Sequence, residues 1–193
     1  MVKKLSPELK EKIAKAVVEA EQRTSADIAL AVLPASDPYQ SHLICYGFAL
    51  GSIIDMGLWT AKTITGFPLL FAIQVTSVLA ALFIPLLRGV YLKLVPKRVM
   101  HHYAARRACE EYLIVSRHAP AERPVVLLYI SLTERYVHIL HSRNVLQRVQ
   151  NEAWETVIQE FTAGMKNDSL QDACLTAIQN IARILESSFP RNV

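Results

Sequence analysis

Two long apolar runs interrupt a chain whose other hydrophobic residues recur at helix or strand periods. The first run spans residues 43–61, and the second, residues 63–87, contains no charged side chain. A helix rises about 1.5 Å per residue, so roughly twenty apolar residues cross the hydrocarbon core of a bilayer. We therefore predict a two-helix transmembrane hairpin with helices at about 43–61 and 67–92. Asp55 and three glycines weaken the first run, for which a re-entrant or interfacial segment is the alternative; two buried core helices are the alternative for the pair.

Outside the hairpin, apolar residues at three- to four-residue spacing predict helices and short apolar blocks predict strands. Ser6 and Pro7 have the form of a helix start, whereas Asn144 with Gln147, and Asp168, are candidate caps of two later helices. The resulting order is a helix at 7–23, a strand at 27–33, the hairpin, a helix at 97–118, strands at 125–130 and 136–141, and helices at about 144–161 and 168–189.

These elements predict one α/β domain, a sandwich in which helices cover the faces of a small mixed sheet, interrupted after its first strand. Residues 1–38 and 96–193 form the domain, and residues 39–95 form the insertion. The short connection at 131–135 predicts an antiparallel pair of strands. Because strands of one sheet lie on both sides of the hairpin, the chain must cross the membrane an even number of times.

The distribution of charge favours a membrane partner. A formal charge of +4 and a pI near 9.0 would suit nucleic acid, but the basic residues cluster after the second apolar run, where cations meet anionic headgroups, so nucleic acid is not an expected partner. We expect contacts with membrane lipids, and with another membrane protein, from Arg88, Lys93, Lys97 and Arg98. By the positive-inside bias, the domain and both termini face the cytoplasm.

Several short segments resemble the TPM-domain family, which is named for thylakoid-lumen phosphatase-like, photosystem-repair and acetylcholine-receptor-modulating proteins. The segments are residues 24–30, 123–131 and 134–139, together with Trp154 and the closing Phe189-Pro190. The resemblance covers the chain outside the hairpin, and bacterial members with an apolar hairpin after the first strand are similar in organisation. It implies an α/β sandwich, with acid-phosphatase activity or calcium binding in some members.

The chain departs from the family where the family's acidic residues matter. Members commonly place Asp and then Gly after the third strand, and the corresponding positions here are Ser142 and Asn144. Asp27 is the matching acidic residue that remains, so it is the candidate ligand for a divalent cation such as calcium. Capping a strand or pairing with a nearby cation is its alternative role.

No P-loop, G-x-S-x-G elbow or paired-carboxylate spacing occurs in the sequence. Asp55 lies inside the first apolar run, where burying a charged side chain in the membrane costs free energy, so it is a candidate contact to another membrane protein. The function predicted is a membrane-anchored TPM-like domain of the bacterial inner membrane, crossing it twice and acting as an interaction or assembly module. The alternative is a divalent-metal-dependent phosphatase, and the missing catalytic spacings favour an interaction module over an enzyme.

Overall fold

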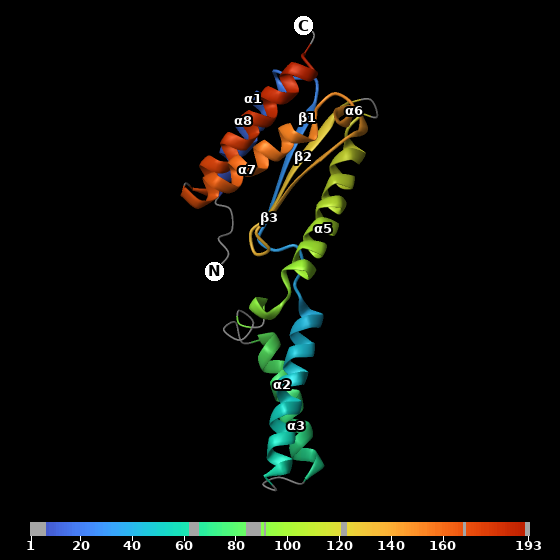
Figure 1. Cartoon of the computed structure of the whole chain (residues 1–193), viewed down its shortest axis with the longest axis vertical. Helices are drawn as coiled ribbons and strands as arrows, with labels where there is room; N and C mark the ends of the chain where they lie inside the picture. Colours follow the sequence, from blue (N-terminus) through green and yellow to red (C-terminus); the bar gives the residue numbers. More distant parts are fainter. Residues whose placement is uncertain are drawn as a thin grey trace. The chain divides into compact units, whose positions relative to one another are not determined.

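The computed structural model describes residues 7–61, 66–83, 90, 92–120, 123–167 and 169–191. The chain divides into two compact units (Figure 1). One comprises Met1–Ser36 with His101–Val193, and we call it the sheet unit; the other, Asp37–Met100, is the apolar unit. The boundaries expected from the sequence lay at 38/39 and 95/96, whereas the second boundary in the structure falls inside a helix.

A three-stranded mixed sheet forms the centre of the sheet unit. Strand β1 (Asp27–Leu33) pairs in parallel with β2 (Val125–Ser131), and β2 pairs antiparallel with β3 (Tyr136–His141). All seven residues of β2 are buried, as expected of a central strand covered on both faces. The three strands and the antiparallel pairing predicted from the sequence are therefore confirmed.

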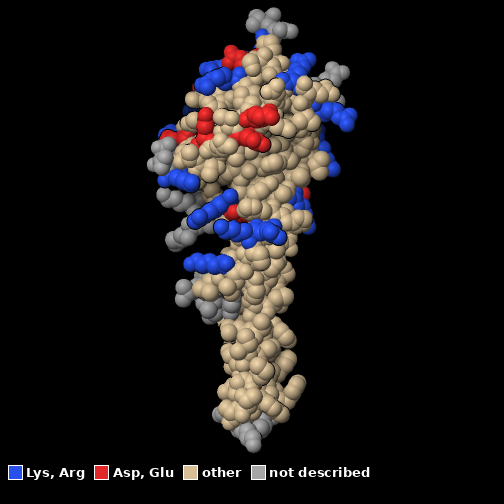
Figure 2. All heavy atoms as spheres, viewed as in Figure 1, with Lys and Arg blue, Asp and Glu red and all other residues tan. Residues whose placement is uncertain are grey.

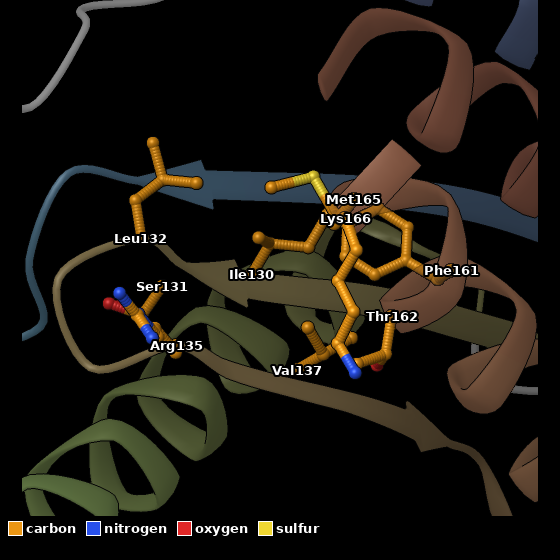
Figure 3. Close-up of a pocket in the computed structure, with 9 residues that line it drawn as sticks. All are labelled: Ile130, Ser131, Leu132, Arg135, Val137, Phe161, Thr162, Met165 and Lys166. Atoms are coloured by element: carbon orange, nitrogen blue, oxygen red, sulfur yellow. The ribbon is translucent and has the colours of Figure 1, made fainter. Parts of the chain in front are cut away.

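Three helices cover one face of this sheet: α1 (Pro7–Glu21), α7 (Asn151–Asn167) and α8 (Leu170–Ser188). Their apolar sides meet alternate residues of β2 in a single core, in which Trp154 and Phe161 are buried. Helix α5 (Lys97–His118) contributes its part from His101 onward to the sheet unit and lies on the opposite side of β2 and β3 from α7 (Figures 1 and 3). These layers are those of an α/β fold.

The helix expected at 144–161 begins later than its sequence pattern indicated. A single turn, α6 (Arg143–Leu146), is followed by a break, and α7 starts at Asn151. The main-chain N–H of Ser142 donates to the carbonyl of Val125 at 2.9 Å, which ties this turn to the end of the sheet. Val149 lies in the core, whereas Leu146 is 53% exposed. The apolar spacing that predicted one helical face therefore combined residues of α6 and the break after it with residues of α7.

The cap expected at Asp168 lies outside the described residues. Ser169 occupies the N-cap of α8, where its Oγ accepts a hydrogen bond from the main-chain N–H of Asp172 at 3.2 Å. Serine is among the preferred residues at this position because its side chain satisfies one of the unpaired N–H groups of the first turn. Ser6 also lies outside the described residues, and the described part of α1 begins at Pro7.

The apolar unit includes α2 (Gln40–Thr60), α3 (Phe67–Phe83) and the first turn of α5. Helix α2 is long and apolar enough to cross a membrane, with 21 residues and a mean hydropathy of 1.4. Helix α3 is apolar but shorter over its described residues. Most of the region that the sequence assigned to the end of the second helix, residues 84–89 and 91, lies outside the described part of the chain.

Candidate functional site

Asp27, the candidate metal ligand, is held in an ion pair at the start of the sheet. Its Oδ1 lies 2.9 Å from Nη1 of Arg123, and its main-chain N–H donates to the carbonyl of Pro124 at 2.8 Å. The parallel register places Asp27 beside Val125, which brings the segment before β2 against the first residue of β1. Pairing with a cation, the alternative role considered for Asp27, is therefore what the structure contains.

Residues from three of the segments on which the family resemblance rests gather around this pair. Thr24 Oγ1 donates to the carbonyl of Phe189 at 2.7 Å, and the N–H of Ser25 donates to the same oxygen at 3.0 Å. A polar surface cavity of about 450 Å³ opens here, and its walls include Asp27 and Arg123. Segments near residues 24, 123 and 189 thus form one contiguous end of the domain.

The donor set at this end is a poor match to a divalent cation. Calcium takes six to eight oxygen ligands, and the two carboxylates that line the cavity, Glu21 and Asp27, are already engaged. Glu21 Oε1 accepts the main-chain N–H of Ile28 at 3.0 Å, and Asp27 pairs with Arg123. Within the described ranges, no three His, Cys, Asp or Glu residues are grouped to hold a metal ion. The metal role of Asp27 stays a prediction.

The opposite end of β1 and β2 carries a buried polar network. Ser36 donates its main-chain N–H to Glu134 Oε1 at 2.9 Å and its hydroxyl to Ser131 Oγ at 2.9 Å, and it lies 2.8 Å from the hydroxyl of Tyr129. Ser131 in turn donates to Glu134 Oε2. Burial raises the pKa of the Tyr129 phenol, which stays neutral in this network. These bonds fix the segment in which the chain leaves β1.

Inside the apolar unit, small and polar residues form the interface between α2 and α3. Ser77 Oγ donates to the carbonyl of Gly47 at 2.9 Å, and Gln74 Nε2 donates to the carbonyl of Phe48 at 2.9 Å. A Cβ placed on Gly47 would lie 2.9 Å from the Cα of Val78, closer than real contacts allow. The two backbones therefore approach as closely as glycine permits, which is typical of helix pairs within membranes.

The outer surfaces of the same two helices are apolar. On the face that Figure 2 shows, neither red nor blue atoms interrupt the tan surface over α2 and α3. Large hydrophobic side chains are at least 40% exposed along both helices: Ile44, Phe48, Leu50, Ile53, Ile54, Met56 and Trp59 on α2, and Phe67, Leu69, Phe71, Val75, Leu79 and Phe83 on α3. Gln74 and Ser77 thus face the interface between the helices, whereas the exposed surface is mostly apolar and uncharged, with Ser52, Thr60 and Thr76 among its exposed hydroxyl residues.

Asp55, the candidate partner contact, continues the inner face of α2. It follows Gly47 and Gly51 at four-residue intervals and is half-buried, whereas residues 52–54 and 56–57 are exposed. Its Oδ1 is buried, and among the described residues no group makes a hydrogen bond to it. A buried carboxylate oxygen without a donor costs free energy, about 1–3 kcal/mol for a neutral group and more for a charged one.

Of the basic residues expected at the membrane surface, Lys93, Lys97 and Arg98 have exposed side chains. Lys93 precedes the bend at Val95, and the other two open α5 after Pro96. Arg88 lies outside the described residues. The three cations are free to contact solvent or anionic headgroups.

A second cavity, of about 440 Å³, opens between the end of α7 and the turn that joins β2 to β3 (Figure 3). Ile130 and Phe161 are almost fully buried in its walls, and Arg135 and Lys166 are the charged residues that line it. Arg135 has φ 50°, the left-handed conformation that favours glycine. The cavity has no signal in the sequence, because its lining residues come from β2, the turn, β3 and α7, which only the fold brings together.

Comparisons with known proteins bear on the fold alone. No family model and no curated protein matches the chain. The NMR structure of the BA42 protein from the psychrophilic bacterium Bizionia argentinensis is similar, with a TM-score of 0.58 over 98% of this chain and 87% of that one. Its sequence identity is 13%, so the likeness defines a mixed α/β fold and carries no chemistry to this chain.

Proposed function

We propose that this protein is a membrane-anchored TPM-like domain of the bacterial inner membrane that serves as an interaction and assembly module for membrane proteins. The observation that carries the proposal is that the apolar unit exposes large hydrophobic side chains around a helix interface with polar contacts. Gly47 and Ser77 meet at the interface of α2 and α3, while large hydrophobic residues cover the outside. Burying that outer surface against lipid removes an apolar area that a water-soluble protein would leave exposed at a high free-energy cost.

Two lines support a crossing that goes out and returns. Helix α2 spans about 32 Å at 1.5 Å per residue, comparable with a hydrocarbon core of about 30 Å. Strands β1 and β2 lie on either side of the apolar unit in the sequence and pair over seven residues, so both must be on the same side of the membrane. The exposed Lys93, Lys97 and Arg98 favour the cytoplasm for that side.

Asp55 supports the partner-binding half of the proposal. Its carboxylate has one buried oxygen without a hydrogen-bond donor among the described residues, on a helix whose outer face is apolar. The residue is only half-buried, so a donor from a neighbouring transmembrane helix can reach its side chain, and an ionisable residue within a membrane is by default a candidate functional residue. Tethering the domain to the membrane also raises its effective concentration near other membrane proteins.

The anchor is tested by fractionation and reporters on the full chain. We expect the protein to stay in the membrane fraction after alkaline carbonate extraction, and a C-terminal reporter that fluoresces only in the cytoplasm to light up. Release of the full chain by carbonate would refute the anchor. Activity of an export-dependent reporter at the same terminus would refute the orientation.

The assembly role is tested by crosslinking in native membranes followed by identification of the captured proteins. We expect Asp55→Leu to lower the yield of a captured membrane protein, and Met56→Leu, a neighbouring change on the exposed side of α2, to leave it unchanged. Equal yields from the two variants would remove Asp55 from the proposal.

A further inference from the structure

We propose that the cavity between α7 and the β2–β3 turn binds a single-chain amphiphile with an anionic head, such as a medium-chain carboxylate. This inference is independent of the membrane anchor, because every residue that lines the cavity belongs to the sheet unit. Its volume of about 440 Å³ falls within the range of roughly 300–1,000 Å³ of small-ligand pockets.

The walls of the cavity select for an apolar body. Five hydrophobic side chains from β2, the turn, β3 and α7 line it, namely Ile130, Leu132, Val137, Phe161 and Met165 (Figure 3). Ile130 and Phe161 are only 2% and 3% exposed and belong to the main core, so they form a rigid wall. The others are half-buried and leave apolar surface that an alkyl chain would cover.

The charges of the cavity select for an anion. Arg135 and Lys166 line it, and both side chains are exposed to solvent. No Asp or Glu is among the lining residues; Glu134, the neighbour of Arg135, directs its carboxylate to Ser36 and Ser131 instead. Arg135 lies at the β2–β3 turn and the end of Lys166 lies beside Thr162 on α7, so each is placed to pair with a carboxylate at its own side of the apolar wall (Figure 3). The planar guanidinium of arginine fits a carboxylate with two parallel hydrogen bonds.

The backbone at Arg135 is a second, independent observation. Its φ of 50° is unfavourable for a residue with a Cβ, and glycine or asparagine would fit this turn without strain. Arginine therefore occupies a position where the fold itself would prefer another residue. Unusual conformations of this kind are concentrated at binding sites, where the side chain supplies the reason for the strain.

The test uses the full chain in nanodiscs of zwitterionic phosphatidylcholine, so that no detergent competes for the cavity. The probes are octanoate, octanol and octyltrimethylammonium, each with a trifluoromethyl end group and followed by ¹⁹F NMR, with empty nanodiscs correcting for partition into lipid. We expect octanoate to bind about tenfold more tightly than octanol, and octyltrimethylammonium more weakly than either. Equal binding of octanoate and octanol, or no binding beyond that of empty discs, would overturn the proposal.

Variants separate binding from folding. The double variant Arg135→Gly with Lys166→Gln removes both cations while relieving the strained backbone, so we expect an unchanged or higher Tm together with about tenfold weaker octanoate binding and unchanged octanol binding. Thr162→Trp, at an exposed position lining the cavity, should weaken both probes by filling it. Lys12→Gln removes an exposed cation on α1, away from the cavity, and should change neither. Octanoate binding that survives the double variant would refute the anionic site.

Discussion

Alanine substitution at the glycines of α2 should loosen the helix pair in a graded order that the structure predicts. A Cβ on Gly47 would lie 2.9 Å from the Cα of Val78 and 3.0 Å from the Cβ of Ala81, so the opposing backbone must move. A Cβ on Gly51 would collide with Ser77 Oγ and with the side-chain amide of Gln74, and both are ends of side chains that can move away. Nothing lies within 4 Å of a Cβ on Gly57, which makes Gly57→Ala the matched control.

The free energy of helix packing lost in each variant follows from the contacts that must move. Inserting a methyl group against a packed backbone costs about 1–3 kcal/mol, the expected loss for Gly47→Ala. Moving Ser77 and Gln74 sacrifices their 2.9 Å bonds to the carbonyls of Gly47 and Phe48. Hydrogen bonds between transmembrane helices average about 0.6 kcal/mol each, so Gly51→Ala should cost about 1.2 kcal/mol, toward the low end of the range for Gly47→Ala. The gain in helix propensity of about 1 kcal/mol applies whether or not the helices are packed, so it leaves the packing equilibrium unchanged.

The equilibrium can be read from the distance between the two helices. Spin labels on cysteines at Ile54 and Phe71, both on exposed sides, report that distance by pulsed electron double resonance on the full chain in nanodiscs. Cys45 and Cys109 are replaced by serine, whereas Cys174 is buried and can remain. Each 1.4 kcal/mol lowers the ratio of packed to separated helices tenfold, so Gly47→Ala should broaden the distribution to longer distances.

The outcome that refutes this reasoning is specific. If Gly47→Ala and Gly57→Ala give the same distribution as the wild type, the close approach of α2 and α3 does not exist in the nanodisc sample. If all three variants separate the helices equally, the effect belongs to glycine itself and not to the contacts that distinguish Gly47 from Gly57.

Further predictions concern the sheet unit. Burial raises the pKa of the Cys174 thiol to about 12. In the Cys45→Ser variant, a thiol reagent at pH 8 should therefore label the exposed Cys109 at once and the buried Cys174 only on unfolding. Equal labelling rates would contradict the buried position of Cys174. Because the folded protein holds the Cys174 proton to higher pH than the unfolded chain, the contribution of this thiol to stability is complete below pH about 8.5 and is lost as pH rises toward 12. In denaturation curves, Cys174→Ala should therefore remove this part of the loss of stability at high pH. Ser169→Ala should lower the free energy of unfolding, measured by chemical denaturation, by about 1 kcal/mol because the N-cap of α8 is lost. The control is Ser187→Ala, since the hydroxyl of Ser187 donates to the carbonyl of Ile184 within the same helix. Equal losses in the two variants would argue against capping. Arg123→Gln should lower the free energy of unfolding by less than about 1 kcal/mol, since the Arg123 side chain is 52% exposed. A loss of several kcal/mol would mean that the pair with Asp27 is more deeply desolvated than the structure indicates.

The strands and most helices were predictable because their signals are local. The apolar blocks at 27–33 and 125–130 and the short connection before Tyr136 define β1, β2 and β3 with little help from the rest of the chain. The start of α7 was not predictable in the same way. Leu146 and Val149 fit a helical face by spacing, but only the hydrogen bonds of Ser142 to Val125 show that the chain makes a turn there first.

The candidate sites show the same division. The sequence identified Asp27 and Asp55 as the notable carboxylates, since one matches a family position and the other interrupts an apolar run. It did not identify Arg123 as the partner of Asp27, because that contact joins residues 96 positions apart through the pairing of β1 with β2. Arg135 was equally hidden, because a turn conformation with positive φ depends on the strands that the turn connects.

The sequence by itself determined the element types and the presence of a long apolar insertion, because hydrophobic period and run length follow directly from the order of residues. It also determined that the insertion must return to its starting side if strands before and after it share a sheet. Only the tertiary structure decided that β1 and β2 pair in parallel, that Gly47 and Gly51 face α3, and that Arg135 and Lys166 line one cavity. Those facts depend on which surfaces meet, and a meeting of distant surfaces is set by the packing of the whole unit and not by any local stretch of chain.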